Sequence, residues 1–173
     1  MKTRVRSRLQ SLPQGVADAA LFFVVTVVVF TVAGALWGAL YPTTQVRISA
    51  DAGAEIVPET VDAGFQAYAW YIVGSVVLGF ALARWAYTTL RRGVTQLLWL
   101  FCWVLFGAWW AILIGARVVE AVHPMDRSVT QPGDVFYVVD FISAWPVVLV
   151  APTIAVLSYW IGAVVDDPDS FEN

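Results

Sequence analysis

Four long blocks of uncharged, mostly apolar residues constrain this chain more than any other feature of its sequence. They cover residues 19–40, 65–83, 94–116 and 141–165. About 20 such residues, wound into a helix, are needed to cross a hydrocarbon core about 30 Å thick. A soluble domain of 173 residues has too small an interior to bury four blocks of this length. The pattern therefore predicts an integral membrane protein.

The composition supports this prediction and excludes several classes of protein. Hydrophobic residues make up 60% of the chain and charged residues 13%, against about 45–50% and about 25% in soluble domains. The net charge is −3 and no basic stripe is present, so we expect no nucleic-acid partner. A single cysteine, Cys102, forbids an internal disulfide, and a single histidine, His123, excludes bis-histidine haem and the common zinc hydrolase motifs. No phosphate-binding glycine loop occurs, so no cofactor is predicted.

Each block should be a helix, because lipid cannot satisfy unpaired backbone groups. We therefore predict an all-α fold, a four-transmembrane-helix bundle that forms one integral membrane domain over residues 1–173. The turn between the second and third spans is short and predicts that these two spans form an antiparallel hairpin. Pro146 and Pro152 remove two backbone donors from the fourth span and predict a bend there.

Lysine and arginine predict the orientation, because they concentrate on the cytoplasmic side of membrane proteins. Seven of the ten basic residues lie before the first span or between the second and third, and only Arg47, Arg117 and Arg127 lie elsewhere. Both termini are therefore expected in the cytoplasm, with two longer loops outside. Ala33-Gly34-Ala35 also resembles a signal-peptide cleavage site. The apolar run continues past it to Leu40, which favours an uncleaved helix.

The two outer loops, residues 41–64 and 117–140, differ in their patterns. In the first, Gln45–Ile48 and Glu55–Val57 flank a turn-like segment, which is typical of a small β-hairpin. The second contains Pro124, Pro132 and Gly133 and is expected to be irregular. Glu120, His123 and Asp126 follow one another at three-residue spacing in that loop. They are weak candidates for a divalent metal site, and a solvated acidic surface is the competing interpretation.

Small residues within the spans predict close helix packing, because they let helix backbones approach each other. They do not say whether the contacts lie within one chain or between chains. The predicted packing residues are Gly34, Gly38, Ser75, Gly79, Gly107, Ala111, Gly115, Ala155 and Gly162.

The third span carries an aromatic stripe at helical spacing, formed by Trp99, Trp103, Phe106 and Trp110. These rings could contact a lipid or a quinone, or simply fill the bundle. No ionisable residue lies at the centre of any span. Proton-coupled transport needs such a group inside the bundle, so transport by this chain alone is disfavoured.

Several short motifs follow one another in a distinctive order. Gly34-Ala35-Leu36-Trp37-Gly38 precedes Tyr41-Pro42 and the second span, and a short basic turn and an Ala/Gly-rich third span follow. The last motifs are Ala151-Pro152, Tyr159 and an acidic tail from Asp166. This order resembles a family of small four-pass membrane proteins from actinobacteria, a family of unknown function. The resemblance implies four helices in a bacterial plasma membrane and supplies no catalytic residue.

Three hypotheses of function follow from the sequence. The first is a non-enzymatic accessory or scaffold subunit that packs against a larger membrane or cell-envelope partner, or against copies of itself. The second is a protein that handles lipids or polyprenyl lipids, as a flippase or in envelope assembly. The third is a metal-assisted enzyme at the outer face that uses Glu120, His123 and Asp126.

Overall fold

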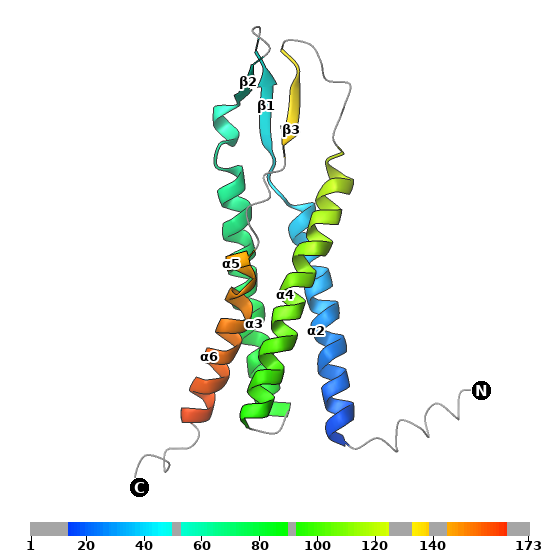
Figure 1. Ribbon diagram of the computed structural model, residues 1–173, viewed down its shortest axis with the longest axis vertical. Coiled ribbons are helices and arrows are strands. Elements are labelled where there is room, and N and C mark those ends of the chain that lie inside the picture. The colour runs from blue at the N-terminus through cyan, green and yellow to red at the C-terminus, as the bar shows by residue number, and fades with distance from the viewer. Residues whose placement is uncertain (1–13, 50–52, 90–92, 125–132, 139–144, 166–173) are drawn as a thin grey trace, which may run out of the picture.

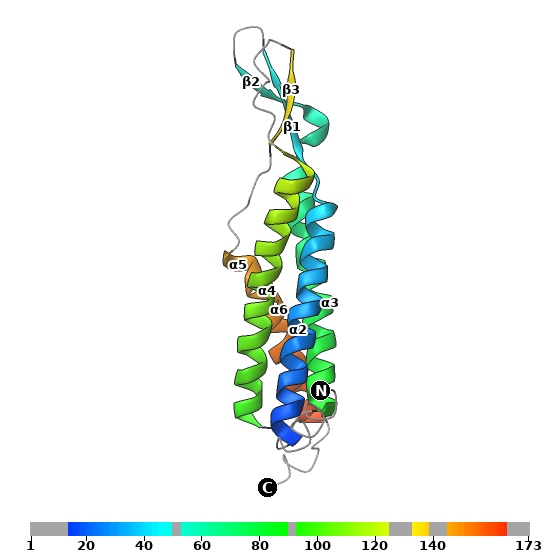
Figure 2. The same cartoon turned by 90° about the vertical axis from the view of Figure 1, so that its right-hand side faces the viewer.

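The computed structural model describes residues 14–49, 53–89, 93–124, 133–138 and 145–165. Its helices are α2 (Gln14–Ala39), α3 (Ala63–Thr89), α4 (Val94–Val122), α5 (Trp145–Val148) and α6 (Val150–Val165), with a 3-10 turn, η1, at Pro58–Thr60. Four helical segments are long and apolar enough to cross a membrane, with α5 and α6 together forming the fourth. The predicted bundle of four membrane-spanning helices is therefore confirmed, and Figures 1 and 2 show it as an elongated rod.

Two helices run well past the span ends that the sequence predicted. The second span was expected to end at residue 83, but α3 continues through Arg84 to Thr89. The third was expected to end at residue 116, but α4 continues through Arg117 to Val122. A charge marks where a chain leaves hydrocarbon, not where its backbone stops being helical. The 29 residues of α4 give a length of about 43 Å, more than a bilayer core requires.

The helices pair in a way that the loop lengths did not predict. Helix α2 packs chiefly against α4, and α3 packs chiefly against α6, which also meets α4. The consecutive helices α3 and α4 run antiparallel, as the short turn predicted, but they meet at few points. The bundle therefore consists of two pairs of parallel helices, α2 with α4 and α3 with α6.

Small residues explain this choice of partners. A Cβ atom added at Gly34 would overlap the backbone of Ala111, and one added at Gly38 would overlap Gly115. In the other pair, a Cβ added at Gly79 would overlap Ala151. Backbones that approach this closely gain dispersion contacts along the helices, which is the principal source of helix association in lipid.

A small antiparallel sheet stands beyond the helices at one end of the rod (Figure 1). Its strands are β1 (Thr44–Ile48), β2 (Ala54–Ile56) and β3 (Val135–Val138), in the order β2-β1-β3. The hairpin predicted in the first loop is confirmed, with Val46 opposite Ile56. The second loop was expected to be irregular, but β3 pairs with β1 and places Val46 opposite Phe136. The four residues of β3, Val-Phe-Tyr-Val, are too short a run to be recognised as a strand without the partner strand.

The fourth span is interrupted where its prolines predicted a bend. The helix ends at Val148, Leu149 forms a turn, and α6 begins at Val150. Pro152 has no N–H to donate to the carbonyl of Val148, which removes one helical hydrogen bond there. Residues 141–144 of the predicted span lie outside the described residues.

Replacing Gly34 by alanine should destabilise the bundle, because the added methyl group overlaps the backbone of α4. We expect Gly34→Ala to lower the free energy of unfolding by about 1–3 kcal/mol. The matched control is Gly74→Ala, since a Cβ at Gly74 meets no atom within 4 Å. That control should leave stability unchanged or raise it by up to about 1 kcal/mol. Denaturant titration in mixed micelles measures both, and equal effects would contradict the proposed contact.

Candidate functional site

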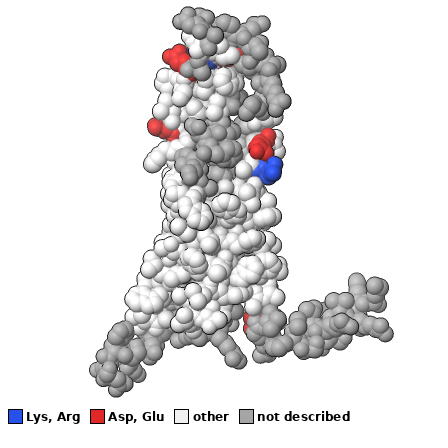
Figure 3. All heavy atoms as spheres, in the orientation of Figure 1, with Lys and Arg blue, Asp and Glu red and all other residues white. Residues whose placement is uncertain are grey.

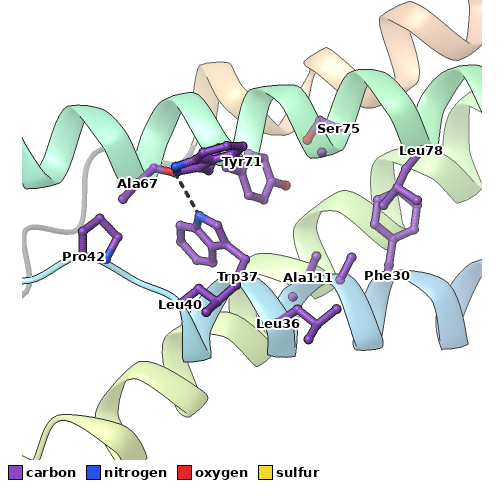
Figure 4. Close-up of a pocket in the computed structure, with 14 residues that line it drawn as sticks. Phe30, Leu36, Trp37, Leu40, Pro42, Ala67, Tyr71, Ser75, Leu78 and Ala111 are labelled. Carbon is purple, nitrogen blue, oxygen red and sulfur yellow. Dashed lines mark hydrogen bonds between the residues drawn. The ribbon is translucent and has the colours of Figure 1, made fainter.

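A cavity of about 300 Å³ lies between α2 and α3, in the half of the bundle nearer the sheet (Figure 4). Most of its wall is carbon. The lining residues are Phe30, Ala33, Gly34, Leu36, Trp37 and Leu40 of α2 and its end, Pro42, then Ala67, Trp70, Tyr71, Gly74, Ser75 and Leu78 of α3, and Ala111 of α4.

The helix pairing leaves this space open. Because α2 is drawn to α4 and α3 to α6, the facing sides of α2 and α3 meet at few points. Small residues on both walls, Ala33 on α2 and Ala67 and Gly74 on α3, leave the gap unfilled. Leu36 and Trp70 at its rim are 59% and 68% exposed, so the cavity opens sideways toward the surroundings of the bundle.

Trp37 holds α2 against α3 at the sheet end of the cavity. Its indole N–H donates a hydrogen bond to the carbonyl of Ala67 at 2.9 Å, which Figure 4 shows as a dashed line. The ring also meets Tyr41 and Tyr71 edge to face, with centroids 5.1 and 5.5 Å away. One side chain thus positions the start of the first loop and the opposite wall together.

Tyr71 connects the same wall to a third helix. Its hydroxyl is buried and donates a hydrogen bond to the carbonyl of Ala108 in α4 at 2.9 Å. Trp37 and Tyr71 therefore both direct their polar hydrogens at backbone carbonyls and not into the cavity. Ser75 and the exposed Trp70 are the other polar side chains of the wall. This lining favours an apolar ligand.

The aromatic stripe of the third span lies along the seam between α2 and α4. Trp99, Trp103, Phe106 and Trp110 contact one another in sequence, with centroids 5.9 to 6.3 Å apart. Rings of α2 extend the row, since Phe22 lies 5.2 Å from Trp99 and Phe23 lies 4.4 Å from Trp103. The Trp110 indole N–H donates to the Thr31 hydroxyl at 2.9 Å. The stripe thus joins two helices of the chain, although Phe106 remains 43% exposed.

The predicted packing residues lie at contacts within the chain. Beyond the glycines of the two helix pairs, Gly107 faces the ring of Phe30 and Gly115 faces Trp37. Ser75 and Ala155 are buried. A Cβ atom added at Gly162 would lie 3.5 Å from the Tyr87 ring. The Gly162 carbonyl accepts a hydrogen bond from the Tyr87 hydroxyl at 2.9 Å.

The candidate metal residues are not brought together in the part of the chain that the structure describes. Glu120 belongs to α4, His123 follows the helix end, and Asp126 lies outside the described residues. The Glu120 carboxylate instead lies 3.5 Å from Arg117, and both side chains are largely exposed. No group of three metal-ligating side chains occurs among the described residues.

Charged side chains lie toward the two ends of the rod. Asp18 and Arg84 are exposed, and Asp140 lies outside the described residues. Figure 3 shows the acidic and basic side chains of one face near the sheet end and at the opposite foot, with an uncharged stretch between them. This distribution agrees with the four apolar blocks of the sequence.

Sequence reasoning missed the cavity and the roles of Trp37 and Tyr71. In the sequence, aromatic residues near the end of a span indicate only membrane depth. The hydrogen bonds to Ala67 and Ala108 depend on how α2, α3 and α4 pack together, which the sequence does not give. The open position of Gly74 also follows from that arrangement.

Comparison with known proteins adds no relative. No family model matches the chain, and searches of curated proteins and of solved structures gave no match either.

Removing the Tyr71 hydroxyl should weaken the connection between α3 and α4. We expect Tyr71→Phe to lower the free energy of unfolding by about 0.6 kcal/mol and at most about 1.7 kcal/mol, the range for hydrogen bonds between membrane helices. Trp70→Phe is the matched control, because Trp70 is exposed on the same helix. Denaturant titration of the two variants checks this, and a smaller loss in Tyr71→Phe than in Trp70→Phe would oppose it.

Proposed function

We propose that the chain is a non-enzymatic accessory or scaffold protein of the bacterial plasma membrane, which docks a larger membrane or cell-envelope partner through its sheet. The observation that carries this proposal is the central position of β1, which pairs with strands from both loops. Two loops that the sequence separates by two membrane spans are thereby joined into one platform.

The sheet suits docking because its shape is set before any partner arrives. The N–H of Ile48 donates to Asp134 at 2.9 Å and the N–H of Gly133 donates to Ile48 at 2.8 Å, which extends the pairing beyond β3. Arg47 and Glu55, which are paired across β1 and β2, are both exposed. A preformed surface avoids the entropic cost of ordering a loop on binding.

The sequence left open whether the small residues pack within the chain or against a partner. Gly34, Gly38 and Gly79 are covered by helices of the same chain. The partner would therefore meet the sheet, with Glu55 on β2, and the neighbouring Glu59. Both carboxylates are exposed.

The orientation is part of the proposal. Seven of the ten basic residues precede α2 or lie between residues 84 and 92 of the sequence. The start of α2, the end of α3 and the start of α4 all lie at the end of the rod opposite the sheet. The positive-inside rule places that end, and both termini, in the cytoplasm and the sheet outside. The resemblance to actinobacterial four-pass proteins supports the same membrane.

Site-specific photo-crosslinking in cells tests the docking role. A photoreactive amino acid at Glu55, exposed on β2, should give one protein adduct of reproducible mass. The matched control is Leu98, which is 59% exposed at the other end of the rod and should give none. No protein adduct at Glu55, together with recovery of a lone monomer after several gentle extractions, would contradict the proposal.

A lipid-handling role is the alternative, and the cavity between α2 and α3 favours it. Its wall is apolar, it opens sideways, and it lies within two spans. A scaffold and a lipid-binding protein are compatible, because the sheet and the cavity occupy different parts of the molecule.

A further inference from the structure

We propose that the cavity between α2 and α3 binds one membrane phospholipid with an amine in its headgroup, whose acyl chain enters beside Gly74 and whose headgroup lies near Asp62. This inference deepens the lipid-handling alternative and does not depend on docking through the sheet.

The size of the cavity suits a hydrocarbon chain. Its volume is about 300 Å³, and its wall spans Phe30 to Leu40, ten residues or about 15 Å of α2. A long, thin space of this kind fits a flexible chain of methylene groups.

The chemistry of the wall also favours hydrocarbon. The polar hydrogens of Trp37 and Tyr71 are donated to the carbonyls of Ala67 and Ala108. A polar ligand would therefore lose its hydrogen bonds to water and find few replacements, which is unfavourable. Gly74 leaves open space for an occupant, since a Cβ there meets nothing within 4 Å.

Polarity along one exposed stripe of α3 follows the order of groups in a phospholipid. Asp62, Gln66, Trp70 and Gly74 recur every four residues and are all exposed, so they form an oblique ridge that winds about 120° around the helix. Trp70 and Gly74 line the cavity, and Gln66 and Asp62 continue the ridge beyond it toward the sheet. The Asp62 carbonyl accepts a hydrogen bond from the N–H of Gln66 at 2.9 Å, so helical spacing extends back to Asp62. The stripe thus changes from apolar at Gly74, through an amide, to a carboxylate about 18 Å away.

Each depth along this stripe matches one part of the lipid. Tryptophan prefers the boundary between headgroups and hydrocarbon, so Trp70 marks the depth of that boundary. Gly74 then lies among acyl chains, and the amide of Gln66 lies where lipid ester carbonyls accept hydrogen bonds. The carboxylate of Asp62 attracts a positive group and repels an anionic one, which favours an amine-bearing headgroup.

Native mass spectrometry from nanodiscs that contain equal amounts of phosphatidylethanolamine and phosphatidylglycerol tests the proposal. The native chain should keep one phosphatidylethanolamine at collision energies that remove other lipids. Gly74→Phe should reduce that retention about ten-fold or more, because its ring occupies the cavity. The matched control is Val77→Phe, since Val77 is exposed on the same helix and does not line the cavity. It should retain lipid like the native chain.

Two further variants keep the test decisive. Ala33→Phe fills the cavity from the α2 wall and should also lose the lipid. It serves as an independent check in case the ring in Gly74→Phe turns out of the cavity. Asp62→Asn should abolish the preference for phosphatidylethanolamine, whereas Glu120→Gln, at an exposed carboxylate on α4, should keep it.

Three results would overturn the inference. They are undiminished lipid retention in both filled variants, equal retention of phosphatidylglycerol by the native chain, and recovery of a quinone, a polyprenyl lipid or a second copy of the chain in place of a phospholipid. The Glu55 photo-crosslink should persist in Gly74→Phe, so failure of lipid binding and failure of docking give different results.

Discussion

The close approach of helix backbones at three small-residue contacts determines how this bundle is arranged. Gly34 and Gly38 bring α2 against Ala111 and Gly115 of α4, and Gly79 brings α3 against α6. In lipid, helices gain nothing from burying apolar surface as such, so van der Waals contact at short range decides which helices pair. The length of the connecting loops has less influence on which helices pack together, because consecutive spans run antiparallel whether or not they are in contact.

Two consequences of that pairing shape the rest of the molecule. Parallel pairing of α2 with α4 brings the loops that follow these two helices to the same end and side by side, where β1 can pair with β3. It also draws α2 away from α3, and Trp37 bridges the space between them at its sheet end. The platform proposed for docking and the cavity proposed for lipid thus arise from one packing preference.

The number of spans could be predicted from the sequence because hydrocarbon imposes a strict length and charge requirement on each block. The hairpin of β1 and β2 could be predicted because both strands and their turn are local. The strand β3 could not, since its four residues form a strand only by pairing with β1, about ninety positions earlier in the chain. The helices α3 and α4 extend past the predicted span ends through Arg84 and Arg117, because a charged side chain that leaves the membrane does not stop the helix.

The residues of the candidate site were harder to predict for a related reason. Gly34 and Gly38 were recognised as packing residues from their spacing alone. The open position of Gly74, however, looks the same in the sequence as the filled position of Gly79. A glycine packed against another helix can be told from one beside open space only when the neighbouring helices are known, and the choice of neighbours depends on the whole bundle.

The pairing of α2 with α4 is tested most directly by thiol cross-linking in membranes. In a Cys102→Ala chain, cysteines replacing Phe23 and Trp103, whose rings lie 4.4 Å apart, should be joined rapidly by a short bifunctional reagent. Cysteines replacing Ala81 of α3 and Trp103 should not be joined, because α3 and α4 meet at few points. Cross-linking of the second pair without the first would contradict the arrangement of helices described above.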